Sequence, residues 1–152
     1  MSDAIVIVDA KRSAIGNFNG GLASLSAVEI ATPVVKAILE ANSIKPEEVD
    51  EVILGQVLTA TAGQNPARQT AIQSGIPENK TAMTINQVCG SGLRTVALGM
   101  QARLWPQEST TRGGRRDRRA RGRTAHGRPK WQRVGVSGAV QFQQLRARVV
   151  QQ

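Results

Sequence analysis

Short apolar runs alternate with helix-period apolar patterns over the first hundred residues. Residues 4–10 form an apolar, β-branched run typical of a strand buried on both faces. Ser26 stands three residues before Glu29, which is the spacing of a capping box, and apolar residues then recur at helical period. We therefore predict a strand followed by a helix that ends near Asn42, with a kink or tilt at Pro33.

The alternation continues along the chain. Residues 45–48 look like a helical turn leading into a second buried strand at 49–58, and Asn65-Pro66 has the residue types that open a helix. Residues 82–88 are a third strand candidate, and helical spacing returns after a glycine-rich turn at 89–92. The predicted order is βαβαβα, which places residues 1–101 in the α/β class.

The charge of the chain is concentrated in its last third. The formal net charge is +9, but residues 1–101 hold 7 basic and 9 acidic side chains, whereas residues 102–152 hold 13 basic and 2 acidic ones. Residues 111–130 are rich in arginine. These charged side chains repel one another, and the segment offers no apolar face. We predict two parts, an ordered segment at 1–101 and a disordered, arginine-rich basic tail at 102–152.

Cysteine and histidine each occur once, as Cys89 and His126. This excludes an internal disulfide framework and a four-ligand zinc site of Cys and His, so we predict no metal. The amino terminus lacks the basic leader and apolar run of a signal peptide, and no stretch approaches the roughly 18 apolar residues of a membrane span. The sequence predicts a soluble, cytoplasmic chain without a membrane partner.

Cys89 is the candidate catalytic residue. It sits where a buried strand gives way through Gly90 and Gly92 to a helix, so its thiol should lie near a helix N-terminus, whose partial positive charge stabilises a thiolate. The backbone N–H groups of such a turn, that of Cys89 among them, are possible donors to an oxyanion. The alternative is a structural cysteine that packs as a small hydrophobic residue.

Four segments resemble one known family. Residues 86–94 read Asn-Gln-Val-Cys-Gly-Ser-Gly-Leu-Arg, which closely resembles the acyl-enzyme signature of thiolases, the acetyl-CoA acetyltransferases. Residues 13–20, 51–58 and 63–69 are similar to thiolase segments in the expected order. The resemblance extends from Met1 to about Gln101 and implies an incomplete N-terminal half of the thiolase fold.

The resemblance implies acyl transfer between thioesters. Cys89 would be acylated by acetyl-CoA or a 3-ketoacyl-CoA and would pass the acyl group to CoA or to an acetyl-CoA carbanion, in covalent, ping-pong chemistry. Coenzyme A thioesters are then substrates, and no separate cofactor is implied. The family also implies homo-oligomers, dimers or tetramers. Residues 63–69 favour a biosynthetic, short-chain role, whereas acyl-chain length and direction stay open.

The sequence departs from the family plan after Gln101. Thiolases activate the nucleophile with a histidine of a Gly-His-Pro segment and use a second cysteine as acid and base, but here His126 lies in Ala-His-Gly-Arg-Pro and no second cysteine exists. We interpret His126 as a solvated residue and the tail as the product of a frameshifted or truncated thiolase reading frame. The chain as written is expected to be catalytically inactive.

Two functions of other classes compete with this interpretation. The tail taken at face value is a basic arm for nucleic acid, with Trp105 and Trp131 available for stacking, although no recognised binding module accompanies it. The ordered part is alternatively an interaction fragment whose apolar helix faces pair with a second copy or with an intact thiolase. Salt-dependent binding of nucleic acid would indicate the basic arm, and poor solubility of the expressed chain would indicate the interaction fragment.

Overall fold

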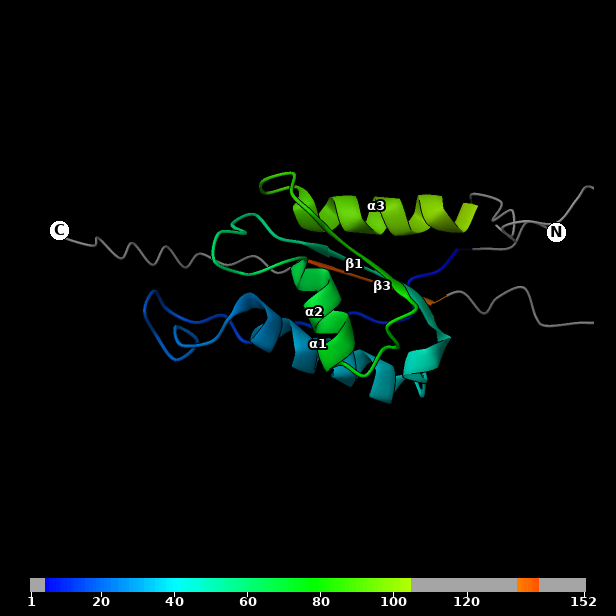
Figure 1. Ribbon diagram of the computed structural model, residues 1–152, viewed down its shortest axis with the longest axis horizontal. Coiled ribbons are helices and arrows are strands. Elements are labelled where there is room, and N and C mark those ends of the chain that lie inside the picture. The colour runs from blue at the N-terminus through cyan, green and yellow to red at the C-terminus, as the bar shows by residue number, and fades with distance from the viewer. Residues whose placement is uncertain (1–4, 105–133, 140–152) are drawn as a thin grey trace, which may run out of the picture.

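A computed structural model describes residues 5–104 and 134–139, with side chains described from 5 to 102. Helices and parallel strands alternate along the chain, so the predicted α/β class is confirmed (Figure 1). The elements are α1 (Ala27–Ala41), the 3-10 helix η1 (Pro46–Glu48), β1 (Val49–Gly55), α2 (Pro66–Gln73), β2 (Thr81–Ile85), α3 (Ser91–Leu104) and β3 (Val134–Ala139).

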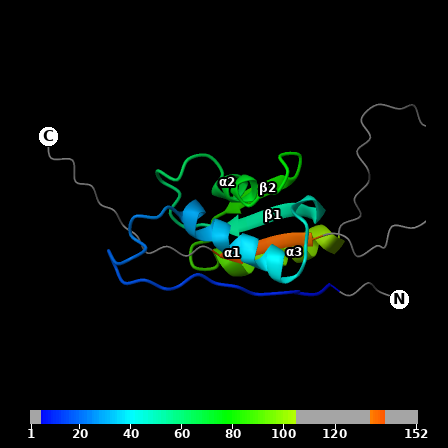
Figure 2. The same cartoon turned by 90° about the horizontal axis from the view of Figure 1, so that it is seen from below.

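The three strands form one parallel sheet in the order β2-β1-β3. The register places Ile53 opposite Met83 of β2 and opposite Ser137 of β3. Helix α3 covers one face of this sheet, and α1 and α2 cover the other, as the two views in Figures 1 and 2 show. The central strand β1 is therefore covered on both faces, and this explains its nearly continuous apolar sequence.

The hydrophobic core lies between β1 and the pair of helices α1 and α2. Val52 and Leu54 of β1 point to this side, and Ile76 closes the core behind the end of α2. Ile53 and Gly55 alternate to the opposite face, toward α3. The buried members of the core are Ala31, Val35, Leu39, Val49, Val52, Leu54, Ala67, Ala71 and Ile76.

The predicted N-termini of α1 and α2 are both confirmed. The Ser26 hydroxyl accepts a hydrogen bond from the Glu29 N–H at 3.2 Å, and the Ser26 N–H donates to the Glu29 carboxylate at 2.7 Å. Helix α1 ends at the cap Asn42, with Pro33 inside it on the exposed side, and the kink there stays a prediction. Asn65 caps α2 by accepting from the Arg68 N–H.

The predicted strand at residues 4–10 is wrong. The chain from Ile5 to Val8 has no regular secondary structure, and its apolar side chains are exposed, by 77% at Ile7. The edge of β1 away from β2 is occupied by β3 instead. Because β1 already has a neighbour on each edge, residues 5–10 do not pair with it.

Strand β3 also corrects, at residues 134–139, the prediction that the tail at 102–152 is disordered. Residues 134–139 carry no charged side chain and have valine at alternate positions, which suits a strand. Helix α3 likewise continues past the predicted boundary at Gln101 to Leu104. The predicted disorder of residues 105–133 and 140–152, including His126 and both tryptophans, lies outside the described residues.

The apolar face of α3 is open along the helix. Leu93, Val96 and Met100 recur at the predicted helical spacing, and all three side chains are exposed, Leu93 by 79%. A surface of this kind is what the interaction-fragment alternative requires. Pairing with a second copy stays a prediction.

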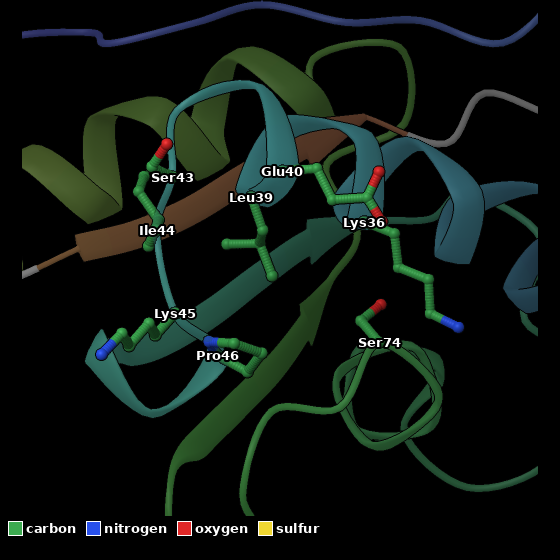
Figure 3. A pocket seen from close by; sticks show the side chains of 8 residues that line it. All are labelled: Lys36, Leu39, Glu40, Ser43, Ile44, Lys45, Pro46 and Ser74. Carbon is green, nitrogen blue, oxygen red and sulfur yellow. The ribbon is translucent and has the colours of Figure 1, made fainter.

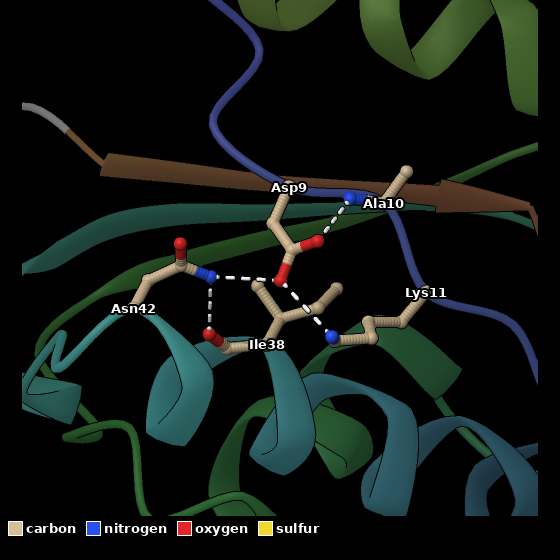
Figure 4. A network of polar contacts seen from close by, with 5 residues as sticks. All are labelled: Asp9, Ala10, Lys11, Ile38 and Asn42. Atoms are coloured by element: carbon tan, nitrogen blue, oxygen red, sulfur yellow. Dashed lines mark hydrogen bonds and ion pairs between the residues drawn. The ribbon is translucent and has the colours of Figure 1, made fainter.

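Asp9 ties the amino-terminal segment to the end of α1 (Figure 4). Its carboxylate accepts a hydrogen bond from the Asn42 side chain at 2.8 Å and from the Ala10 N–H at 2.7 Å, and Lys11 lies 3.5 Å away. The Asn42 amide also donates to the Ile38 carbonyl oxygen, which fixes its orientation. The hydrogen bond from Asn42, followed by that from Ala10, lowers the pKa of Asp9 below its ordinary value of 3.8.

This contact is expected to depend on acidity. Because the pKa of Asp9 is lower in the folded chain, its stabilising contribution is complete above the unfolded value of 3.8 and is lost as the pH falls through the lowered value. An NMR titration of the Asp9 carboxyl carbon measures this midpoint. Asn42→Ala is expected to move the midpoint upward, and an unchanged midpoint would show that Asn42 does not hold Asp9.

Candidate functional site

Cys89 lies in the turn that joins the end of β2 to the start of α3. The carboxyl ends of β1 and β2 meet at this edge of the sheet, because the two strands run parallel. Ligands of open α/β sheets bind at the carboxyl ends of the strands. The Cys89 side chain is exposed, so the alternative of a buried structural cysteine does not describe this chain.

The backbone before Cys89 is strained. Val88 has a φ of 48°, in the left-handed region that β-branched residues rarely adopt. The Gly90 N–H donates to the Gln87 carbonyl oxygen at 3.0 Å and closes the turn. Such conformations cost energy and persist only where neighbouring groups enforce them.

Two side chains hold this turn in place. The Ser91 hydroxyl accepts a hydrogen bond from the Gln87 N–H at 2.8 Å and donates to the Val88 carbonyl oxygen at 2.7 Å. The Asn86 side chain accepts from the Val88 N–H at 2.8 Å, and its amide donates to the Val57 carbonyl oxygen at 2.9 Å. The turn is thereby attached to the chain that leaves β1.

Gly55, the last residue of β1, lies against Ser91. A Cβ at position 55 would lie 2.7 Å from the Ser91 carbonyl carbon and 2.8 Å from its Cβ, distances that real side chains essentially never show. The strand and the first residue of α3 therefore approach as closely as the absence of a side chain allows. This contact fixes where α3 begins relative to the sheet.

Beside the start of α3, one backbone donor of the turn has no acceptor within the described residues. The Gly90 carbonyl oxygen accepts the first helical hydrogen bond, from the Arg94 N–H at 2.9 Å. Within the part of the chain that the structure describes, the backbone N–H of Cys89 donates to no protein group. This donor is open to a group bound beside the thiol.

Two of the hollows in the described part of the chain bear on the choice of site. The larger, of about 500 Å³, lies between the end of α1 and the end of α2, at the amino end of β1 and so away from Cys89 (Figure 3). The smaller, of about 380 Å³, includes Asn86 and Ile85 and borders the Cys89 turn. The smaller hollow is the candidate binding site, because it shares Asn86 with that turn.

Neither a metal cluster nor a membrane span occurs in residues 5–104 and 134–139. No group of three His, Cys, Asp or Glu side chains there is placed to hold a metal ion. No helix in this part of the chain is both long and apolar enough to cross a bilayer.

The sequence predicted Cys89 and its two glycines but not the residues that position them. Ser91, Asn86 and Gly55 act through contacts between segments that are distant in the chain or hidden in the turn. The sequence did hold one signal for Ser91, because a serine at the first position of a helix commonly hydrogen-bonds to neighbouring backbone groups. The third predicted strand was also too long, since residues 86–88 leave the sheet for the turn.

Comparison with known proteins agrees with this arrangement. Residues 5–105 match the family model described as thiolase, N-terminal domain. The chain belongs to the thiolase family. This confirms the resemblance of the first hundred residues, and the match ends close to the predicted boundary at Gln101.

The similar thiolases are much longer than the matched segment. An acetyl-CoA acetyltransferase of Allochromatium vinosum is 63% identical over 102 residues, which cover 67% of this chain and 26% of the relative. A probable acetyl-CoA acetyltransferase of Escherichia coli strain K12 is 58% identical over 98 residues, 64% of this chain and 25% of the relative. The chain thus spans about a quarter of the length of these thiolases.

A solved thiolase structure is also similar. The Acat5 thiolase from Ascaris suum, crystallised in complex with coenzyme A, aligns with a TM-score of 0.56 at 39% identity. The alignment covers 57% of this chain and 23% of that thiolase.

Proposed function

We propose that Cys89 is the acyl-accepting nucleophile of a thiolase and takes an acetyl group from acetyl-CoA. The observation that carries this proposal is the exposed thiol, presented by a strained turn at the carboxyl ends of β1 and β2. Relatives named acetyl-CoA acetyltransferase, and a structural neighbour solved with coenzyme A, support the choice of substrate.

The proposed step is a thioester exchange. The Cys89 thiolate attacks the carbonyl carbon of acetyl-CoA, the carbonyl oxygen takes up negative charge, and the bond to the CoA sulfur then breaks. Acetyl-Cys89 and CoA are the products, and the proton released by the Cys89 thiol balances the one that CoA takes up. The open backbone N–H of Cys89 is the donor we propose for the oxyanion.

Completion of the thiolase cycle needs more than the described residues. Transfer of the acetyl group to CoA or to a second acetyl-CoA requires a general base, and residues 5–104 and 134–139 hold no histidine and no cysteine besides Cys89. We therefore propose that this chain by itself stops at the acyl-enzyme.

The nucleic-acid alternative gains no support from the described residues, because the arginine-rich segment with Trp105 and Trp131 lies outside them.

Intact-protein mass spectrometry after incubation with acetyl-CoA tests the proposal. We expect the mass of one acetyl group on the chain and none on a Cys89→Ala control. We also expect no steady formation of acetoacetyl-CoA. An absent adduct, or an adduct that persists without the thiol, would contradict the proposed role of Cys89.

A further inference from the structure

We propose that Ser91 is a positioning residue for Cys89. Its hydroxyl holds Val88 in the left-handed conformation and thereby sets the direction in which the neighbouring thiol leaves the turn. The inference rests on the proposed function in one respect, that Cys89 is the nucleophile, and it adds a specific residue through which the fold controls that nucleophile.

The first step of the argument is the conformation of Val88. Its exposed, β-branched side chain gains little from packing, so nothing in the side chain itself favours a φ of 48°. Both backbone groups of Val88 are bound, however. Its N–H donates to Asn86, and its carbonyl oxygen accepts from the Ser91 hydroxyl at 2.7 Å and from the Ser91 N–H at 3.1 Å. These bonds offset the cost of the strained backbone.

The second step is the position of the Ser91 hydroxyl. It is buried, with Ser91 only 4% exposed, and it uses both its donor and its acceptor within the turn. One hydroxyl therefore connects the residues on either side of the Gln87–Val88 peptide bond. Removing it would leave the Gln87 N–H without its partner and release one of the two bonds to the Val88 carbonyl.

The third step is the support behind Ser91. Its backbone rests against Gly55, so Ser91 itself has little freedom to move away from β1. The rigid central strand thus fixes Ser91, Ser91 fixes Val88, and Val88 directs Cys89. A positioning role of this kind requires support by a rigid element, which β1 supplies.

A double-variant comparison separates this role from simple stabilisation of α3. Asparagine enters the left-handed region far more readily than valine. If Ser91 acts through the conformation of Val88, then its hydroxyl matters less once Val88→Asn has relieved the strain. A hydroxyl that only stabilised the helix would have the same effect in both backgrounds, since independent contributions add.

The measurement is the second-order rate of alkylation by iodoacetamide, which reports on Cys89 alone because the chain has no other cysteine. Ser91→Ala is expected to slow alkylation by about fivefold, the factor set by one net hydrogen bond. In the Val88→Asn background the same change is expected to slow it by less than about twofold. Thr95→Val removes the buried hydroxyl that lies one helical turn beyond Ser91 and donates to the Gly92 carbonyl oxygen, and is expected to leave the rate unchanged.

Equal effects of Ser91→Ala in both backgrounds, or an unchanged rate in a folded Ser91→Ala chain, would overturn the proposal. If Ser91→Ala does not fold, Asn86→Ala and Asn86→Asp replace it. The first removes the acceptor for the Val88 N–H and is expected to slow alkylation. The second keeps that oxygen but loses the amide that donates to the Val57 carbonyl oxygen, and is expected to recover part of the rate. Iodoacetamide needs no acetyl-CoA, so a chain that fails to be acetylated still tests the role of Ser91.

Discussion

Replacing Ile76 with alanine is expected to lower the free energy of unfolding by about 2–5 kcal/mol. Ile76 is 2% exposed and packs into the core between β1 and the helices α1 and α2. The change removes a large apolar side chain and leaves a cavity that the surrounding strand and helices fill only in part. The Ile76 N–H keeps its bond to the Ala71 carbonyl oxygen, so the loss reports side-chain packing.

Urea unfolding followed by circular dichroism measures this loss. Ile72→Ala is the matched control, because Ile72 lies four residues earlier and is 47% exposed. Its effect is expected to stay within about 0.5 kcal/mol. If the two variants lost the same stability, the core would not lie where the structure places it.

Gly55→Ala is expected to destabilise the chain by about 1–3 kcal/mol and to slow alkylation of Cys89. The added methyl group would lie 2.7 Å from the Ser91 carbonyl carbon, so the start of α3 must move away from β1. Gly55 does not have a positive φ, and the expected effect is therefore steric. Moving Ser91 also disturbs its hydrogen bonds to Gln87 and Val88. For this reason a single methyl group on β1 is expected to lower the reactivity of the Cys89 thiol.

Gly21→Ala is the matched control for this substitution. A Cβ at position 21 meets no atom within 4 Å, and so the change is expected to be neutral or slightly stabilising. Urea unfolding and the iodoacetamide rate are measured on both variants. A Gly55→Ala chain as stable and as reactive as the original would mean that the close contact with Ser91 is not maintained in solution.

Local signals accounted for most of the described fold. The capping box at Ser26, the Asn65-Pro66 start of α2 and the apolar centre of β1 all act within a few residues, and each was confirmed. The pattern was equally clear at residues 4–10, where the predicted strand is absent. Strand formation needs a partner, and the pairing of β1 with residues 134–139 depends on chain segments too far apart for a local pattern to report.

The same difference between local patterns and long-range contacts applies to the candidate site. Cys89 could be predicted because a glycine-flanked cysteine between strand and helix is a local pattern, and its exposure agrees with that prediction. Its role as an acyl acceptor stays a proposal. The positioning contacts could not be predicted, because the Gly55–Ser91 approach joins two elements separated by α2 and β2. The sequence places Gly55 in a predicted strand, but it does not show which element packs against that glycine.

The contact between Gly55 and Ser91 limits how thiolases of this kind can be recombined. A chimaera can take residues 86–91 from one parent and β1 from another. In this chain the two segments contact each other closely only because Gly55 has no side chain. A larger residue at this strand end is expected to shift the incoming helix and, through the proposed role of Ser91, the direction of the thiol. Crossover points placed between these two positions are therefore safe only where both parents carry glycine at the end of that strand.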